Sequence, residues 1–175
     1  MLRILFSDPS RITNGPAIFI DRDRVIDCRR RGDYVLDWSQ FVFLRGIRAA
    51  LKQLACLGMP IIIISNQAAV GKGLLDPTRL KEITGMMHQA PLEDGASLAA
   101  VYYCTHKADE NCLCRKPKPA FLQAATRDFN IDLSRSVFIG DSDADVQAPG
   151  AQAVRLCCWN MLRLPDIGEG VDPET

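Results

Sequence analysis

The chain has 175 residues, of which 47% are hydrophobic and 24% charged, and its 21 basic and 21 acidic side chains give a formal net charge of zero. This composition is typical of a globular protein, and the length suits one domain with a sizeable core. A neutral balance gives no support for binding to nucleic acid or to an anionic membrane surface. No apolar run approaches the roughly 18 residues of a membrane span, and Ser7-Asp8-Pro9 interrupts the apolar start too early for a secretory signal. We therefore expect a cytoplasmic protein with no membrane partner.

Residues 1–15 precede the first strand that the pattern predicts, and we interpret them as an N-terminal extension. Residues 17–20 form an apolar run after Gly15-Pro16, which is typical of a buried strand in a parallel sheet. Asp21 and Asp23 follow and leave the strand on the same side. Ligands of open α/β sheets bind outside the carboxyl ends of the strands, and buried carboxylates need a cation or a proton. The pair therefore indicates a chemical site.

Basic residues surround this first motif. Arg22 and Arg24 flank Asp23, and residues 29–31 are three consecutive arginines. The triplet is a candidate for a phosphate contact, although a solvated turn is the commoner meaning of such a run.

Helices and strands alternate along the rest of the chain, which predicts an α/β fold with a mostly parallel sheet. The acid-rich residues 165–175 are expected to be a loosely held tail, and residues 16–164 to form one domain without a linker. The predicted helices cover residues 45–57, 77–88 and 119–129, with a short helix after Asp143, and the predicted strands cover residues 60–64, 98–103, 136–139 and 153–157.

Polar side chains collect where these strands end. Asp21 and Asp23 follow the first strand, Ser65 the second and Asp141 the fourth, and Lys116 lies between the third and fourth. Acids on neighbouring strand ends suit Mg²⁺, which prefers oxygen ligands. A hydroxyl and an ammonium suit phosphate oxygens, and aspartate is a competent nucleophile in phosphoryl transfer. The sequence therefore predicts a metal-phosphate site.

These residues resemble the four motifs of the haloacid dehalogenase superfamily of phosphatases over residues 17–157. The motifs are Asp21-Arg22-Asp23, Ser65, Lys116 and the run from Gly140 to Asp145. The resemblance implies a Rossmann-like three-layer fold in which Asp21 attacks phosphorus and Asp23 serves as general acid and then as general base. It also implies that Ser65 and Lys116 bind the phosphate. Mg²⁺ would be held by the Asp21 carboxylate, the Asp23 backbone carbonyl and Asp141, with Asp145 supporting this cluster.

A second cluster consists of Cys104, His106, Cys112 and Cys114. Three thiolates and an imidazole form a closed tetrahedral shell, as in structural zinc sites, so residues 104–114 are predicted to be a zinc-binding loop. The alternative is a set of buried free thiols with a surface histidine. The remaining cysteines, which lack such company, are interpreted as core residues or inert thiols; they are Cys28, Cys56, Cys157 and Cys158.

With this loop ahead of Lys116, the chain resembles the D-glycero-D-manno-heptose-1,7-bisphosphate 7-phosphatase and histidinol-phosphate phosphatase subfamily. Residues 41–44, 71–73 and 116–119 favour the heptose side. The resemblance implies that Asn66, Gln67 and Arg115 lie close to the substrate, and Arg115 is the candidate for a second phosphate because a guanidinium matches two phosphate oxygens. With no large cap domain, the site is expected to be open to a small phosphorylated metabolite, and we expect a monomer.

Two departures from the family pattern leave a second function open. Arg24 stands where the family has glycine, a residue that often marks a positive φ. The arginine would either strain the turn and crowd the metal, or add a phosphate contact. Residues 146–151 are also shortened, and Pro149 would end a helix early beneath Asp141. The alternative to an enzyme is therefore a degenerate member that binds a phosphorylated ligand or a partner without turnover.

Overall fold

A computed structural model describes residues 1–9, 14–28, 33–147 and 154–158. Its centre is a six-stranded sheet with the strand order β1-β4-β3-β2-β5-β6. Every neighbouring pair is parallel except β1 and β4, which are antiparallel. The prediction of a mostly parallel α/β fold is confirmed. The strands are β1 (Leu2–Leu5), β2 (Ile18–Ile20), β3 (Ile61–Asn66), β4 (Leu98–Cys104), β5 (Ser136–Gly140) and β6 (Val154–Cys158).

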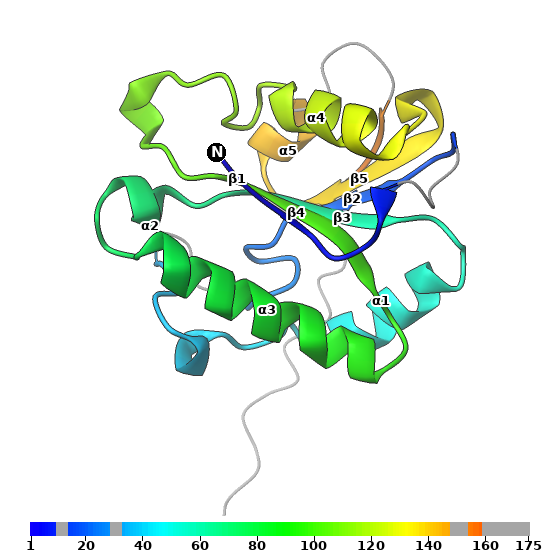
Figure 1. The fold of residues 1–175 in the computed structure, drawn as a ribbon, viewed down its shortest axis with the longest axis horizontal. Coiled ribbons are helices and arrows are strands. Elements are labelled where there is room, and N and C mark those ends of the chain that lie inside the picture. The colour runs from blue at the N-terminus through cyan, green and yellow to red at the C-terminus, as the bar shows by residue number, and fades with distance from the viewer. Residues whose placement is uncertain (10–13, 29–32, 148–153, 159–175) are drawn as a thin grey trace, which may run out of the picture.

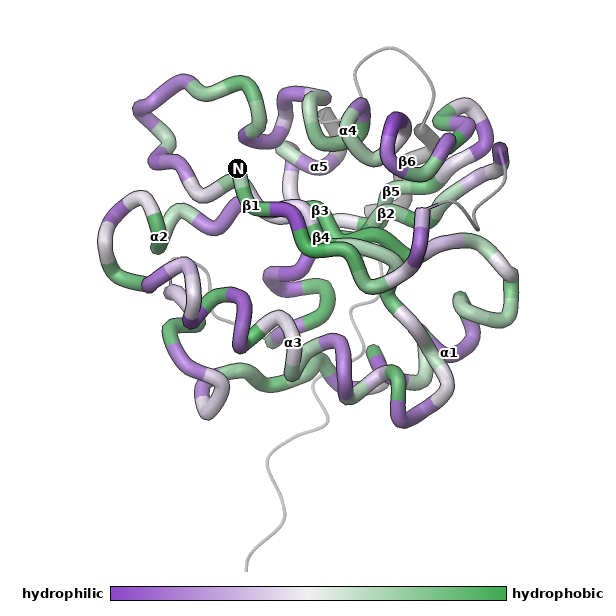
Figure 2. The backbone as a smooth tube through the Cα atoms, in the orientation of Figure 1, coloured by the Kyte–Doolittle hydropathy of each residue, from purple (hydrophilic) through white to green (hydrophobic). Residues whose placement is uncertain are grey.

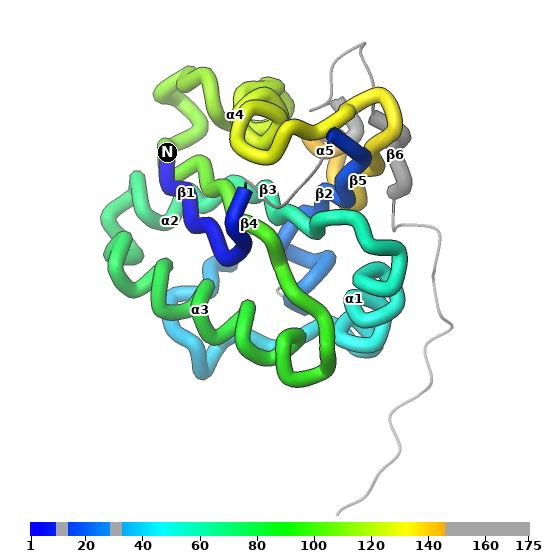
Figure 3. Tube along the Cα trace, turned by 45° about the vertical axis from the view of Figure 1, so that its right-hand side comes forward, coloured from blue at the N-terminus to red at the C-terminus, as the bar shows by residue number. Residues whose placement is uncertain are grey.

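Helices cover both faces of the sheet and make three layers (Figure 1). Helices α1 (Ile47–Ala55) and α3 (Pro77–Glu93) lie on one face, and α4 (Ala120–Phe129) lies on the other, as a second view confirms (Figure 3). The short helices α2 (Ala68–Gly71) and α5 (Asp143–Gln147) follow β3 and β5. Single 3-10 turns are η2 (Trp38–Gln40), η3 (Ala108–Glu110) and η4 (Leu133–Arg135).

The alternation of side chains along each strand divides the core into two clusters. In β2, Ile18 and Ile20 pack with residues of α1 and α3, whereas Phe19 packs with residues of α4. Every residue of β2 and β4 is buried, and strands buried on both faces are built from continuous apolar runs. Figure 2 shows the central strands as mostly hydrophobic. This burial on both faces explains why the strands were recognisable from apolar runs alone.

Helix α3 begins where the sequence predicts and ends later. Asp76 accepts a hydrogen bond from the Thr78 N–H, and Pro77 occupies the first turn, where its missing N–H is tolerated. The helix continues past the expected end at residue 88 to Glu93 because its apolar face continues through the buried Met87 and Pro91.

The N-terminal residues differ from the expectation of an extension. Residues 2–5 form the edge strand β1, which pairs with β4. Leu2 and Ile4 are half-buried while Arg3 and Leu5 face solvent, and this alternation covers too few residues to be recognised in the sequence. The edge is also fixed by Arg3, whose guanidinium binds Asp128 in the last turn of α4 at 2.8 Å.

Between β2 and β3 the described residues contain only η2 and α1, so the expectation of no large cap domain is confirmed for them. None of the described helices has the length and apolarity needed to cross a membrane. The arginine triplet at residues 29–31, the segment around Pro149 and the tail at residues 165–175 lie outside the described residues.

Candidate active site

The carboxyl edge of the sheet brings together acids that are far apart in the sequence. Asp21 follows β2 and Asp141 follows β5, and β2 pairs directly with β5. Asp145 lies in the first turn of α5, beside them. Ligand atoms of Asp21, Asp141 and Asp145 all lie within 4.8 Å of one another. The predicted gathering of these carboxylates at one edge is therefore present in the fold.

Lys116 is the cation at the centre of this cluster. Its Nζ lies 2.8 Å from Asp21 Oδ1 and 2.6 Å from Asp145 Oδ1, and it donates to the Ile64 carbonyl at 3.0 Å. Burial by itself would lower the pKa of Lys116, but the two carboxylates outweigh it and raise that pKa. The ammonium therefore remains charged beside Asp21.

Asp21 is the buried carboxylate that Lys116 contacts. Its Oδ1 also accepts a hydrogen bond from the Arg22 N–H at 2.7 Å. Burial raises the pKa of Asp21 to about 6; Lys116 opposes this rise, while Asp145 and Asp23 add to it. A second cation near Asp21 would favour the ionised form, which is the nucleophilic form.

Asp23 is held from both sides. Arg22 Nε and Nη2 lie 2.8 and 2.7 Å from Asp23 Oδ1, and the Gln67 amide donates to Asp23 Oδ2 at 3.0 Å. The same amide donates to Ser65 Oγ at 3.1 Å. Gln67 therefore links the residue expected to be the general acid to the hydroxyl expected on the phosphate.

Arg22 and Asp27 are functional neighbours that the sequence analysis missed. The Arg22 side chain is fully buried, with Nε 3.4 Å from Asp27 Oδ2 and its guanidinium carbon 5.7 Å from the centre of the Tyr103 ring. An arginine between two acids at the end of a buried strand was a signal that could have identified it. Arg22 serves to position Asp23.

Asn66 and Arg115 make their contacts around Lys116 and the cysteine loop. Asn66 accepts from the Lys116 N–H at 3.0 Å and donates to the Lys116 carbonyl at 3.3 Å. Arg115 Nη1 donates to the His106 carbonyl at 3.5 Å. Asn66 thus fixes the backbone that carries the ammonium, and the expected substrate contacts of both residues remain predictions.

The acids fit Mg²⁺ because one of them presents an unused oxygen. Asp141 Oδ1 is buried and has no hydrogen-bond partner among the described residues. Asp145, by contrast, is engaged through both oxygens, since its Oδ2 accepts from the N–H and the hydroxyl of Ser142 at 3.0 and 2.6 Å. Asp141 therefore has an oxygen available to an ion, whereas both oxygens of Asp145 are already engaged.

Gly140 is needed for this arrangement. A Cβ at residue 140 would lie 2.3 Å from the Asp145 Cβ, closer than real side chains approach. Only glycine lets α5 fold back over the end of β5.

The cysteine loop brings its four predicted ligands together. The sulfur of Cys112 lies 3.5 Å from that of Cys104 and 3.7 Å from that of Cys114, and His106 Nδ1 lies 3.3 Å from the Cys114 sulfur. Tetrahedral zinc with Zn–S distances of about 2.3 Å separates its sulfur ligands by roughly 3.8 Å. The four side chains therefore fit one zinc ion.

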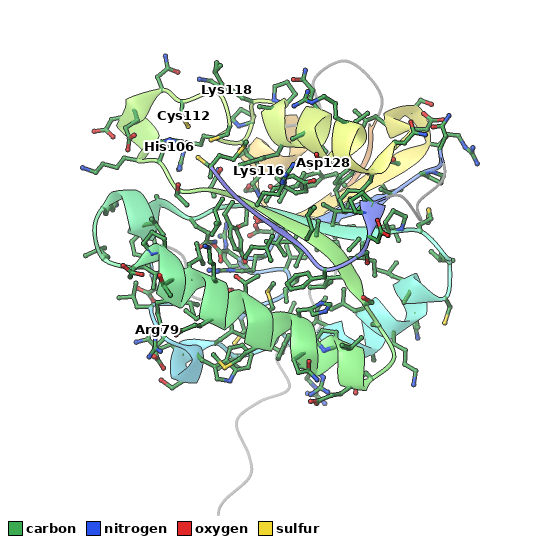
Figure 4. The ribbon with its side chains drawn as sticks, in the orientation of Figure 1. Arg79, His106, Cys112, Lys116, Lys118 and Asp128 are labelled. Carbon is green, nitrogen blue, oxygen red and sulfur yellow. The ribbon has the colours of Figure 1, made fainter. Side chains whose placement is uncertain are left out.

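The chain around these ligands is braced from two directions. The Lys118 ammonium donates to the Cys112 carbonyl at 2.7 Å and to the Asn111 carbonyl at 2.9 Å, and Figure 4 shows Lys118 beside Cys112 and His106. A Cβ at Gly71 would lie 2.5 Å from the Thr105 carbonyl oxygen, so the end of α2 packs directly against the loop.

Two further cysteines lie outside the core. Cys28 and Cys56 are exposed, so only the alternative of inert thiols is left for them, and it remains a prediction. The side chains of Cys157 and Cys158 lie outside what the structure describes.

Comparisons with known proteins find similar sequences. A family model described as haloacid dehalogenase-like hydrolase matches residues 11–151. The chain is 36% identical over 158 residues to the D-glycero-beta-D-manno-heptose-1,7-bisphosphate 7-phosphatase of Helicobacter pylori strain J99, covering 88% of this chain and 90% of that protein. It is 34% identical to the enzyme of that name from Vibrio cholerae, covering 79% and 77%.

A solved structure is similar as well. The D,D-heptose 1,7-bisphosphate phosphatase from B. bronchiseptica, complexed with magnesium and phosphate, superimposes with a TM-score of 0.76 at 28% identity. The match covers 81% of this chain and 78% of that one.

Proposed function

The chain belongs to the haloacid dehalogenase-like hydrolase family, and on that premise we propose that it is a Mg²⁺-dependent phosphatase acting through an aspartyl-phosphate. The observation that carries this proposal is the placement of Asp21, at the end of the central strand and 2.8 Å from the Lys116 ammonium, with Asp141 beside it. A buried carboxylate with an oxyanion-binding cation and further acids has the parts that phosphoryl transfer needs.

In this mechanism Asp21 attacks the phosphorus atom while the sugar oxygen leaves with a proton from Asp23. Asp23 then takes a proton from water, the resulting hydroxide attacks the phosphorus of the aspartyl-phosphate, and inorganic phosphate and the Asp21 carboxylate are released. Ser65 and Lys116 bind the phosphate oxygens. The Asp21 carboxylate, the Asp23 carbonyl and Asp141 would hold Mg²⁺, which neutralises charge on the phosphate. Arg22 and Gln67 orient Asp23 for both of its proton transfers.

The proposed substrate is a small sugar bisphosphate, D-glycero-D-manno-heptose 1,7-bisphosphate. Relatives that carry this activity in their names match most of the chain. Arg115 is the proposed contact for the second phosphate, with Asn66 and Gln67 close to the substrate. A small phosphorylated metabolite is the only partner that we propose, and the monomeric state remains a prediction.

Zinc is proposed as a structural ion. The four ligands would fill a tetrahedral shell, which leaves no position for substrate. The loop leads directly into Arg115 and Lys116, so a bound ion would fix the start of the segment that carries the catalytic ammonium.

The test is phosphate release with Mg²⁺ from heptose and hexose bisphosphates, histidinol phosphate and an aryl phosphate. We expect a preference for the heptose bisphosphate, and loss of release in Asp21→Asn. Preference for histidinol phosphate would replace the proposed substrate. No release from any compound by folded, zinc-loaded protein would favour the non-catalytic alternative.

A further inference from the structure

Arg24 adopts a backbone conformation that arginine rarely takes. Its φ is 63°, in the left-handed region that favours glycine. The turn is held by Asp27, whose Oδ1 accepts from the Arg24 N–H at 3.2 Å. Asp27 is itself buried and contacts Arg22, so this strained turn belongs to the network that holds Asp23. Strain that is maintained at a site is a reason to look for a function.

The Arg24 side chain reaches across to the next strand end. Its Nη2 lies 2.8 Å from Asp141 Oδ2, and the two side chains are 33% and 15% exposed. The other oxygen of the same carboxylate, Oδ1, is the buried atom without a hydrogen-bond partner among the described residues. The two oxygens of Asp141 therefore have different surroundings: Oδ2 contacts the guanidinium, and Oδ1 is available to a ligand.

We propose that Arg24 is a positioning residue that orients Asp141 for Mg²⁺. This inference rests on the magnesium site of the proposed function. By holding Oδ2, the guanidinium restricts rotation of the carboxylate and leaves Oδ1 available to the ion. Partners that orient a ligating carboxylate raise the affinity of its metal site. Arg24 thereby has a role that glycine, which the family usually has at this position, does not supply.

The opposite role would be competition. A guanidinium that took the place of the metal ion would weaken metal binding, since two cations would share one carboxylate. The two roles predict opposite effects on metal affinity when the charge is removed. A measurement of metal binding that does not depend on turnover therefore decides between them.

The experiment is a titration with Mn²⁺, followed by electron paramagnetic resonance, of zinc-loaded wild type and of Arg24→Gln, Arg24→Gly and Arg24→Lys. We expect Arg24→Gln and Arg24→Gly to bind Mn²⁺ roughly tenfold more weakly. Arg24→Lys should recover most of the loss because an ammonium can also donate to Asp141. Arg24→Gly should also melt at a higher temperature than wild type, because glycine relieves the positive φ.

Arg48→Gln is the matched control, because Arg48 pairs with Asp94 away from the site and its loss should leave Mn²⁺ affinity unchanged. Equal or tighter binding by Arg24→Gln overturns the positioning role. Absence of Mn²⁺ binding by wild type and all variants overturns this inference together with the metal site. Phosphate release by wild type, measured in parallel, shows whether the proposed function survives either result.

Discussion

The Lys116 ammonium and the Asp21 carboxylate form a buried ion pair, with Nζ 2.8 Å from Oδ1, although the two residues lie on opposite sides of β3 and β4 in the sequence. Lys116 reaches this position because Asn66, at the end of β3, binds both its backbone N–H and its carbonyl. The pair joins the expected nucleophile to an expected phosphate ligand, and it makes the ionisation of Asp21 a property that can be measured.

Asp21→Asn should abolish turnover and still stabilise the Mg²⁺-free protein at neutral pH. Burial raises the pKa of Asp21 to about 6 from an ordinary value of 3.8, which corresponds to roughly 3 kcal/mol against the ionised form. This figure already includes the favourable contact of the ionised carboxylate with Lys116. The protonated Asp21 makes its full contribution to the free energy of unfolding below pH 3.8, and this contribution is lost as pH rises through about 6. The stability of the Asn variant relative to wild type should therefore increase between those two pH values.

Melting temperatures of both proteins between pH 4 and 8, in buffer freed of Mg²⁺ without a chelator that would extract zinc, measure this effect. An Asn variant that is less stable than wild type at every pH would show that Asp21 is not a strained, buried charge.

Arg22→Met should destabilise the fold strongly. The substitution preserves much of the buried volume but leaves Asp23 and Asp27 without the cation that they share. Removing one partner of a buried ion pair typically costs about 3–5 kcal/mol. Urea denaturation measures the loss. Arg79→Gln is the control, because its contacts with Asp37 and Glu82 are exposed and should contribute little; equal effects of the two substitutions would contradict the role given to Arg22.

Elemental analysis of purified protein that has never been exposed to a chelator should find about one zinc ion per chain. Burial raises the pKa of Cys104 to about 12 and also raises that of Cys114. These thiols are therefore protonated in the metal-free state at neutral pH, and uptake of zinc should release protons, as a weakly buffered titration can detect.

Removal of zinc should reduce turnover, because the loop leads into Lys116. Zinc-free protein with full activity and an unchanged melting temperature would refute the structural role.

Gly140→Ala should reduce turnover at least about tenfold, because the new methyl group would displace Asp145 and with it one of the contacts of Lys116. Gly85→Ala is the matched substitution, since Gly85 lies in α3 with open space where its Cβ would be. Alanine there should instead stabilise the protein by roughly 0.5–1 kcal/mol without changing turnover. Steady-state kinetics and thermal melting of both variants test the pair; normal turnover in Gly140→Ala would show that α5 can shift without harm.

The sequence by itself determined the periodic elements and the residues at their ends. Buried parallel strands are continuous apolar runs, so β2 to β5 were recognisable. The ends of β2, β3 and β5 in the sequence identified Asp21, Ser65 and Asp141 as candidate site residues. The gathering of the four cysteine-loop side chains was also predictable, because they lie close together in the chain and their residue types suit a metal ion. These features depend on local spacing.

Only the tertiary structure decided which of these ends meet and what pairs across them. Strand order is set by packing between distant segments, and the placement of β2 beside β5 brings Arg24 onto Asp141. The burial of Arg22 and the pairing of β1 with β4 likewise depend on neighbours that lie far away in the chain. An arginine has the same local pattern whether it faces solvent or a carboxylate, because its partner is selected by the fold.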